Sequence, residues 1–209
     1  MFIGNKVIKV VNSKINGRIE VIKSLAFGTY ITVGGLTQSG GIVYEIWKKT
    51  LKKVKRNNKS FKNVLILGLG GGSVSILVNK YWTDSKIVGV EIDAEMIQLG
   101  KKYLNTGNVD TRIEDAFLFC KKAFKEKMKF DLIMVDLYLG DRFPEKFDSL
   151  EFINLVKRLL TKQGLVIFNK LYYAEKRKNS LDFAKKVEKV FKNVEYYYPE
   201  ANLMLICSE

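Results

Sequence analysis

The part of the chain from Asn63 onward restricts the fold most strongly, because short apolar runs alternate there with amphipathic stretches. Two of the runs, Val64–Leu67 and Leu132–Val135, contain four apolar residues in a row. Continuous apolar strands are typical of a parallel sheet that is buried on both faces. The predicted strands are Val64–Leu67, Lys86–Glu91, Val109–Ile113, Phe130–Asp136 and Leu165–Asn169. The predicted helices that alternate with them are Val74–Tyr81, Ala94–Leu104, Ala116–Lys127 and Asp148–Leu160.

The end of the chain breaks this alternation. A predicted helix at Glu175–Phe191 is followed by two strand-like runs, Val194–Tyr198 and Leu203–Cys207, with a tight turn at Pro199–Asn202 between them. Strands joined by such a short turn run antiparallel. The sequence therefore predicts an α/β fold with a mostly parallel seven-stranded sheet and an antiparallel C-terminal hairpin. This ending resembles the Rossmann-like class I methyltransferase fold and differs from the all-parallel dinucleotide-binding fold.

The first forty residues predict a separate, small antiparallel β-sheet. Lys6–Val11, Arg18–Lys23 and Thr29–Val33 are short alternating runs separated by Asn, Ser and Gly, residues that favour turns. After a Gly-Gly pair, apolar residues at helical spacing indicate a basic helix at Ile42–Val54, and a linker follows at Lys55–Lys62. We therefore divide the chain into a small N-terminal β-sheet at residues 1–40, a linking basic helix at 41–62 and the α/β domain at 63–209.

Composition excludes several classes of catalysis. The 209 residues include no histidine and two cysteines, Cys120 and Cys207. Ser-His-Asp and Cys-His catalysis and the common zinc sites are therefore excluded, and no metal is expected. The cysteines are too few for a disulfide framework, and we find neither a signal peptide nor an apolar run that could span a membrane. We expect a cytoplasmic protein with no membrane partner.

Charge is distributed unevenly along a chain whose net charge is +14. Residues 48–62 contain eight basic residues and no acidic one, whereas residues 84–151 contain 14 acidic and 11 basic residues. The basic run could contact a phosphate backbone. However, only six of the 36 basic residues are Arg, the residue that base readout and bidentate phosphate contacts favour. Nucleic-acid binding is thus left open but is not favoured.

A glycine-rich loop follows the first predicted strand of the α/β domain. Gly68, Gly70 and Gly72 give the spacing G-x-G-x-G before a helix whose N-terminus offers unpaired N–H groups. Glycine permits a tight turn and the close approach of a ligand to the backbone. A dinucleotide fingerprint would place its third glycine at Ser73, so NAD is disfavoured. We predict that the three glycines contact a nucleotide, and a purely structural turn is the alternative.

Acidic residues stand at the ends of the next strands. Glu91 lies nineteen residues after Gly72, where a carboxylate can accept both ribose hydroxyls while Ile92 lies along the adenine. Asp115 could accept the adenine amino group, although Asp93 and Asp115 could equally be helix N-caps. Asp136 ends the fourth strand, at the edge where open α/β sheets hold ligands. Such an acidic edge fits a cationic sulfonium nucleoside better than a pyrophosphate.

The order of these motifs resembles that of the spermidine synthase family, the aminopropyltransferases, within the class I S-adenosylmethionine-dependent methyltransferase superfamily. The resemblance covers nearly the whole chain and includes Val90–Asp93, Glu114–Ala116 and Phe130–Asp136. It implies that Ala116 and Gln38 join the nucleotide contacts, which comprise Gln38, Gly68, Gly70, Gly72, Glu91, Ile92, Asp93, Asp115, Ala116 and Asp136. It also implies that Asp136 is the catalytic base or orients the amine, with Tyr44 as a second catalytic contact.

The chain departs from that family at several acidic positions. The family usually carries an aspartate in the glycine loop, where this chain has Gly71, and an acidic pair before the tyrosine, where it has Gly40 and Gly41. The family's gate loop begins with two aspartates three residues apart, whereas here Asp141 is the next acid after Asp136. A diamine needs several carboxylates to offset its desolvation. We therefore expect the nucleotide half of the site to be present and putrescine to bind weakly.

These observations lead to an expected function. We expect a transferase that binds S-adenosylmethionine or its decarboxylated form, with a small-molecule acceptor, and we place methyl transfer slightly ahead of aminopropyl transfer. A homodimer is expected. The alternatives are a catalytically silent nucleotide-binding or oligomerisation module and an RNA methyltransferase that uses residues 48–62. The last lacks the common Asn-Pro-Pro-Tyr tetrapeptide, because its fourth strand ends Asp136-Leu137-Tyr138-Leu139.

Overall fold

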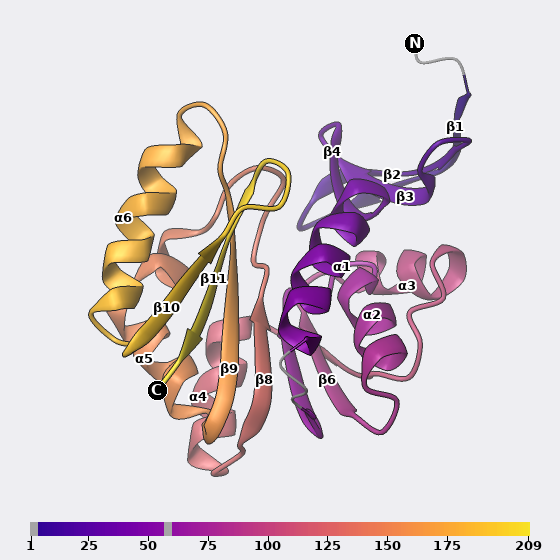
Figure 1. Ribbon diagram of the computed structural model, residues 1–209. Helices are drawn as coiled ribbons and strands as arrows, with labels where there is room; N and C mark the ends of the chain where they lie inside the picture. The colour runs from indigo at the N-terminus through magenta and orange to yellow at the C-terminus, as the bar shows by residue number, and fades with distance from the viewer. Residues whose placement is uncertain (1–3, 57–59) are drawn as a thin grey trace.

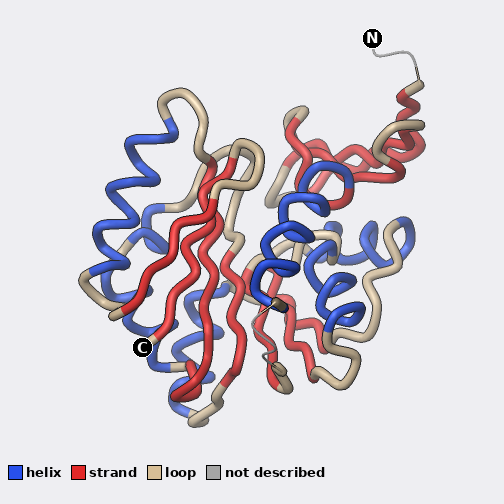
Figure 2. Tube along the Cα trace, in the orientation of Figure 1, coloured by secondary structure: helices blue, strands red, loops and turns tan. Residues whose placement is uncertain are grey.

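The structure is a computed structural model that describes residues 4–56 and 60–209. It contains two β-sheets, the larger of which carries helices on both faces (Figures 1 and 2). Residues 57–59 of the predicted linker, and residues 1–3 of the predicted N-terminal sheet, lie outside the described residues.

The small sheet is antiparallel and has four strands in sequential order, one more than predicted. Its last strand was missed because Gly34 and Gly35 were interpreted as the end of the strand pattern. Both have positive φ values, of 56° and 80°, and form the turn of another hairpin. The strands are β1 (Asn5–Ser13), β2 (Gly17–Ser24), β3 (Gly28–Val33) and β4 (Leu36–Gly40).

The large sheet has seven strands in the order β10-β11-β9-β8-β5-β6-β7. Strand β11 pairs antiparallel with both β9 and β10, and the other pairs are parallel. This topology confirms the predicted fold class. The strands are β5 (Asn63–Leu67), β6 (Lys86–Glu91), β7 (Asp110–Ile113), β8 (Phe130–Val135), β9 (Leu160–Leu171), β10 (Asn193–Tyr197) and β11 (Asn202–Ser208).

The helices lie close to their predicted positions, with one exception. The predicted helix Asp148–Leu160 begins two residues later, at Leu150, because Ser149 accepts a hydrogen bond from the backbone N–H of Phe152 and caps it. A short 3-10 turn that was not predicted precedes it and ends at Asp148. The helices are α1 (Gly41–Lys55), α2 (Ser73–Tyr81), α3 (Ala94–Tyr103), α4 (Ala116–Lys125), η1 (Glu145–Asp148), α5 (Leu150–Arg158) and α6 (Lys176–Glu188).

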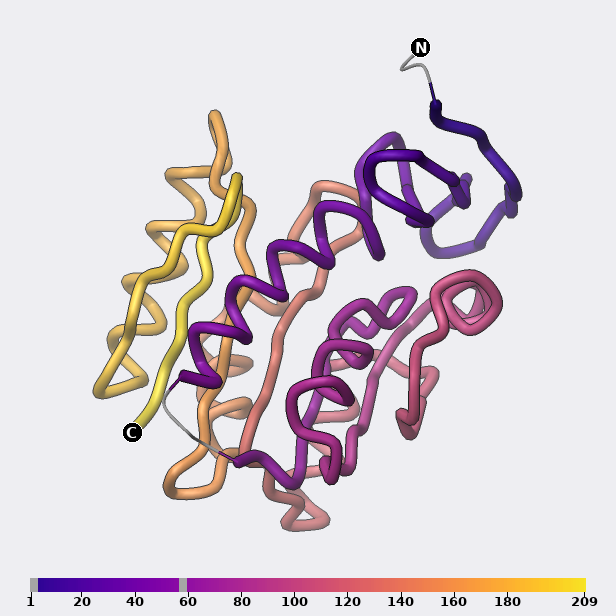
Figure 3. Tube along the Cα trace, turned by 45° about the vertical axis from the view of Figure 1, so that its right-hand side comes forward, coloured from indigo at the N-terminus to yellow at the C-terminus, as the bar shows by residue number. Residues whose placement is uncertain are grey.

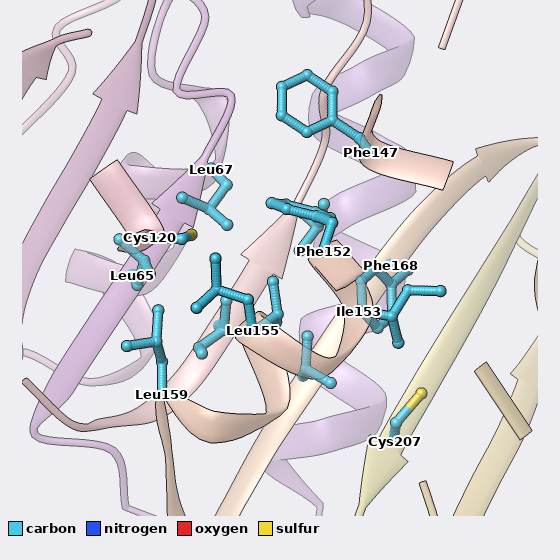
Figure 4. Packing of buried hydrophobic residues seen from close by; sticks show 14 of the residues in the cluster. Leu65, Leu67, Cys120, Phe147, Phe152, Ile153, Leu155, Leu159, Phe168 and Cys207 are labelled. Carbon is cyan, nitrogen blue, oxygen red and sulfur yellow. The ribbon is translucent and has the colours of Figure 1, made fainter. Parts of the chain in front are cut away.

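Two apolar cores hold these layers together. Helices α4, α5 and α6 pack on one face of the large sheet around Phe152 and Phe168, which are at most 1% exposed (Figure 4). Helices α1 and α2 pack on the other face, where Trp47 is fully buried. Figure 3 shows α1 running from the small sheet toward the C-terminal hairpin.

The small sheet has its own apolar contact with the large domain. Ile19, Val21 and Ile31 of β2 and β3 pack against Met96 and Leu99 of α3. This contact places β4 and the start of α1 beside the glycine-rich loop, as the hydrogen bond from the Gly71 N–H to the Ser39 hydroxyl shows. Within residues 4–56 and 60–209, no helix is long and apolar enough to cross a membrane.

Candidate functional site

A cavity of about 390 Å³ opens at the carboxyl-terminal edge of the large sheet. Its floor is formed by the ends of β5, β6, β8 and β9, and its opposite wall by β4 and α1. The turn between β10 and β11 closes one side. This is the position at which open α/β sheets hold their ligands.

The glycine-rich loop forms part of the cavity wall, and its glycines serve different purposes. A Cβ atom on Gly68 would lie 2.0 Å from the backbone oxygen of Asp136, and one on Gly70 would lie 2.8 Å from the Ser39 hydroxyl. Gly68 and Gly70 line the cavity. Gly72 was predicted to contact the nucleotide but does not line it, because this residue packs against Thr106, where a Cβ atom would come within 2.4 Å.

Glu91 lines the cavity at the end of β6, as predicted. Its Oε2 accepts a hydrogen bond of 2.8 Å from the Gly70 N–H, and its Oε1 accepts one of 3.0 Å from the Asp93 N–H. Burial raises the pKa of the Glu91 carboxyl, and these backbone donors partly counteract it. The side chain therefore holds the glycine-rich loop while its carboxylate borders the cavity.

The adenine-side residues predicted from the sequence also border the cavity. Ile92, Asp115 and Ala116 all line it. Asp115 caps α4 through the backbone N–H groups of Phe117 and Leu118, and it forms an ion pair with Lys146. Burial is the largest influence on the pKa of Asp115 and raises it, but the hydrogen bond and charge of Lys146 together with the backbone N–H groups of Phe117 and Leu118 outweigh burial, so the pKa lies below its usual value.

Asp93, for which the sequence left a nucleotide contact and a helix N-cap as equal alternatives, caps a helix. Its Oδ1 accepts a hydrogen bond of 3.0 Å from the Glu95 N–H and caps α3. Its Oδ2 accepts hydrogen bonds from the Ser13 hydroxyl and the Asn16 amide, both at the β1–β2 turn. Asp93 is 2% exposed and does not line the cavity. It joins the small sheet to the large domain.

Asp136 faces the cavity from the end of β8 and is held by two uncharged donors. The Trp47 indole N–H donates to Oδ2 at 2.8 Å, and the Asn169 amide donates to Oδ1 at 2.7 Å. The Asn202 amide in turn donates to Asn169 Oδ1 at 2.7 Å, which fixes the orientation of the Asn169 amide. Burial raises the pKa of Asp136, and the two hydrogen bonds partly offset this.

Gln38 and Tyr44, the two predicted site residues that precede the glycine-rich loop, differ in whether they line the cavity. Gln38 lines the cavity, and its amide donates a hydrogen bond of 3.1 Å to the Gly140 carbonyl oxygen. Tyr44 does not line the cavity: its ring packs beside Lys48 against the core between α1 and the sheet. Residues two positions apart on a helix face different sides, so Ile42 and Ile46 line the cavity and Tyr44 turns away.

Several residues of the site gave no signal in the sequence. Trp47 comes from α1, Asn169 from β9, Glu200 from the β10–β11 turn and Asn202 from the start of β11. None belongs to a motif with recognisable spacing. Trp47 and Asn169 could only have been found by knowing which side chains the fold brings next to Asp136.

Charge in the cavity is opposite to that of the whole chain. Among the described residues, its lining includes five acidic side chains and a single basic one, Lys146, which is paired with Asp115. The acidic residues are Glu91, Glu114, Asp115, Asp136 and Glu200. The same described ranges contain no cluster of acidic or cysteine side chains suited to hold a metal ion.

The fold and the position of the cavity define an α/β protein of the class I methyltransferase type with an added N-terminal sheet. The spermine/spermidine synthase domain matches residues 43–201. The chain belongs to this family.

Individual proteins support this assignment. The chain is 37% identical over 127 residues to a polyamine aminopropyltransferase of Pyrobaculum aerophilum, a match that covers 54% of this chain and 43% of the relative. Its fold is similar to spermidine synthase from Thermotoga maritima, with a TM-score of 0.77 and 20% identity over 97% of this chain and 72% of that one. Human methyltransferase-like protein 13 gives a TM-score of 0.64 at 21% identity, over 80% of this chain and 79% of that one. The chain spans less than two thirds of the length of the first curated relatives.

Proposed function

We propose that the chain transfers an aminopropyl group from decarboxylated S-adenosylmethionine to an amine. The sequence alone placed methyl transfer slightly ahead, but the matching curated relatives are named polyamine aminopropyltransferases. The observation that carries the proposal is the acidic lining of the cavity, in which Asp136 accepts hydrogen bonds from uncharged donors and forms no ion pair among the described residues.

The nucleotide is placed by the residues at the ends of β5, β6 and β7. The backbone of Gly68 and Gly70 approaches the sulfur side of the ribose, and the Glu91 carboxylate accepts its hydroxyl groups. Ile92 lies along the adenine, and Asp115 and Ala116 border its amino edge. All of these residues line one cavity, which supports their assignment to a single ligand.

The lining favours the decarboxylated nucleotide over the ordinary one. The two nucleotides differ by the methionine carboxylate, which needs a positive partner when it leaves water. Lys146 is the one basic side chain in the described lining, and it is already paired with Asp115. A chain that ends in an ammonium alone therefore suits this cavity better than a zwitterionic end that carries an ammonium and a carboxylate.

The reaction is a displacement at carbon. The amine nitrogen attacks the aminopropyl carbon bonded to sulfur, the carbon–sulfur bond breaks, and its electron pair stays on sulfur. The products are the alkylated amine and neutral 5′-methylthioadenosine, and Asp136 accepts the proton that the nitrogen loses. Most of the rate enhancement comes from holding the nucleophile in line with that carbon. Apolar side chains at Ile42, Val43 and Ile46 limit water there.

The test compares the two nucleotides directly. The protein is incubated with each of them and an amine, binding is measured by calorimetry, and products are separated by chromatography. We expect 5′-methylthioadenosine from the decarboxylated form and a large loss of turnover in Asp136→Asn, with the exposed Asp84→Asn as the matched control. Formation of S-adenosylhomocysteine from the ordinary form would instead establish methyl transfer and refute the proposal.

A further inference from the structure

The end of the cavity near Asp136, where the acceptor amine is proposed to bind, is called the amine end. Glu200 is a second carboxylate beside this end, and it is held in an ion pair. It lies in the β10–β11 turn, closed by a 3.1 Å hydrogen bond from the Asn202 N–H to the Pro199 carbonyl oxygen. The residue lines the cavity, and its side chain is 42% exposed. Its Oε1 forms an ion pair with the ammonium of Lys49.

Lys49 reaches Glu200 because of its position on α1. It lies three residues after Ile46, on the same side of the helix, and Ile46 lines the cavity. A second ion pair, 2.6 Å between Lys53 and Glu195, also joins this helix to the hairpin. Lys49 therefore neutralises Glu200 at the edge of the cavity. Figure 3 shows the backbone of α1 running beside the C-terminal hairpin.

The other acids that could serve a diamine are directed elsewhere. Glu45 forms an ion pair of 2.9 Å with Lys48, and Asp141 forms one of 2.8 Å with Lys176. Neither lines the cavity. At Gly71 a Cβ atom would lie 2.8 Å from Ile31 and 2.9 Å from Ser39, so the loop leaves no room there for an acidic side chain.

The wall of the amine end is apolar. It includes Leu36 and Ile42, which are each 39% exposed although they are large apolar side chains, together with Leu171. Open apolar surface of this kind is covered favourably by the apolar body of a ligand. The remaining acids of the lining, Glu91, Glu114 and Asp115, stand at the ends of β6 and β7, where the nucleotide is proposed to lie. A second ammonium at the far end of the amine would therefore have to leave water with the paired Glu200 as its nearest carboxylate.

We infer that the acceptor is a monoamine with an apolar body, and that Lys49 sets this specificity by neutralising Glu200. This inference rests on the proposed function. Asp136 accommodates the one reacting amine, and the paired Glu200 offers no net charge to a second. Removing the Lys49 ammonium frees the carboxylate and makes a diamine acceptable.

The experiment compares 1-aminobutane with 1,4-diaminobutane, which have the same carbon chain. For the parent we expect kcat/KM with the decarboxylated nucleotide to favour the monoamine by about tenfold or more, a difference of 1.4 kcal/mol per tenfold. Lys49→Met should shift this ratio about tenfold toward the diamine. Adding Glu200→Gln to that variant should reverse the shift, and the neighbouring exposed Lys52→Met should leave the ratio unchanged.

Binding of both amines to the protein loaded with 5′-methylthioadenosine is measured in parallel. If no turnover occurs, the proposed function fails, while the binding ratio and its response to Lys49→Met still test the inference. A parent that prefers the diamine, or an unchanged ratio in Lys49→Met, would overturn the inference.

Discussion

At the scale of single residues, the site depends on two carboxylates that uncharged donors hold in place. Glu91 receives backbone N–H groups, and Asp136 receives the side chains of Trp47 and Asn169. Burial raises the pKa of both carboxyls. A charged group that has left water without a charged neighbour is stabilised when a cation or a set of hydroxyl donors arrives. Ligand binding therefore offsets the free-energy cost of burying these two carboxylates in the unliganded protein.

Replacing Glu91 tests its contact with the ribose. Glu91→Ala removes charge-assisted hydrogen bonds and also leaves the Gly70 N–H without its acceptor. We expect affinity for 5′-methylthioadenosine to fall by about 1.5–3 kcal/mol, as measured by calorimetry. Asp84→Ala, at an exposed position of the α2–β6 turn, serves as the control. Equal affinities of Glu91→Ala and the parent would contradict the ribose assignment.

The raised pKa of Asp136 gives a pH dependence of known sign. Its ordinary value is 3.8, and the folded protein raises it, so Asp136 takes up its proton at a higher pH than an exposed aspartate. On acidification, we expect affinity for the cationic decarboxylated nucleotide to begin to fall at a pH above the range in which an exposed aspartate titrates. This affinity should fall more steeply than affinity for neutral 5′-methylthioadenosine. Glu91 is proposed to contact the ribose, which both nucleotides contain, so the ratio of the two affinities reports the protonation of Asp136. In Asp136→Asn this ratio should no longer change with pH.

Sequence patterns located some of these residues and missed others for a physical reason. Glu91 and Asp136 were predicted because parallel strands end at a common edge, where their terminal acids meet. Tyr44 was assigned by resemblance, and helical geometry turns it away from the cavity. Trp47 and Asn169 contact Asp136 across long separations in sequence, and such contacts leave no local pattern.

At the scale of elements, the predicted strands and helices mostly agree with the structure, and the differences have local causes. Strand β9 begins at Leu160, five residues before its predicted start, because the exposed residues Lys162 and Gln163 obscure the apolar pattern. The register between β8 and β9 shifts at this point, between Phe130 and Leu132. Apolar periodicity identifies the buried part of a strand and not its exposed extension.

Several lysines of the basic helix α1 form ion pairs with glutamates. Three of the lysines in the basic run at residues 48–62 form ion pairs: Lys48 with Glu45, Lys49 with Glu200 and Lys53 with Glu195. These pairs leave less positive charge for a nucleic acid. Two of them connect α1 to the C-terminal hairpin. Formation of a homodimer stays a prediction.

Asp93 provides a test of how the two sheets are joined. Asp93→Ala removes the cap of α3 and the acceptor for Ser13 and Asn16 at the β1–β2 turn. A lost cap costs about 1 kcal/mol, and the buried Ser13 hydroxyl left without its acceptor costs about 1–3 kcal/mol, whereas Asn16 is only partly buried and can turn to water. We expect stability in urea to fall by roughly 2–4 kcal/mol, with faster proteolysis of the small sheet. Unchanged stability would show that the apolar contact with α3 is sufficient.

At the scale of the whole molecule, an acidic cavity opens on a strongly basic protein. The net charge is +14, whereas the described lining of the cavity holds five acidic side chains and one basic. The decarboxylated nucleotide carries a sulfonium and an ammonium. It is therefore repelled by the molecule at long range and attracted by the cavity only at short range.

This contrast predicts an unusual salt dependence. Added salt screens charges separated by more than about 10 Å at 0.1 M, so it weakens the long-range repulsion more than the attraction inside the cavity. We expect the association rate of the decarboxylated nucleotide, measured by stopped flow, to rise several-fold between about 20 and 200 mM salt. Neutral 5′-methylthioadenosine should associate at a constant rate. A rate that falls with salt would mean that the carboxylates around Asp136 already attract the cation from outside the cavity.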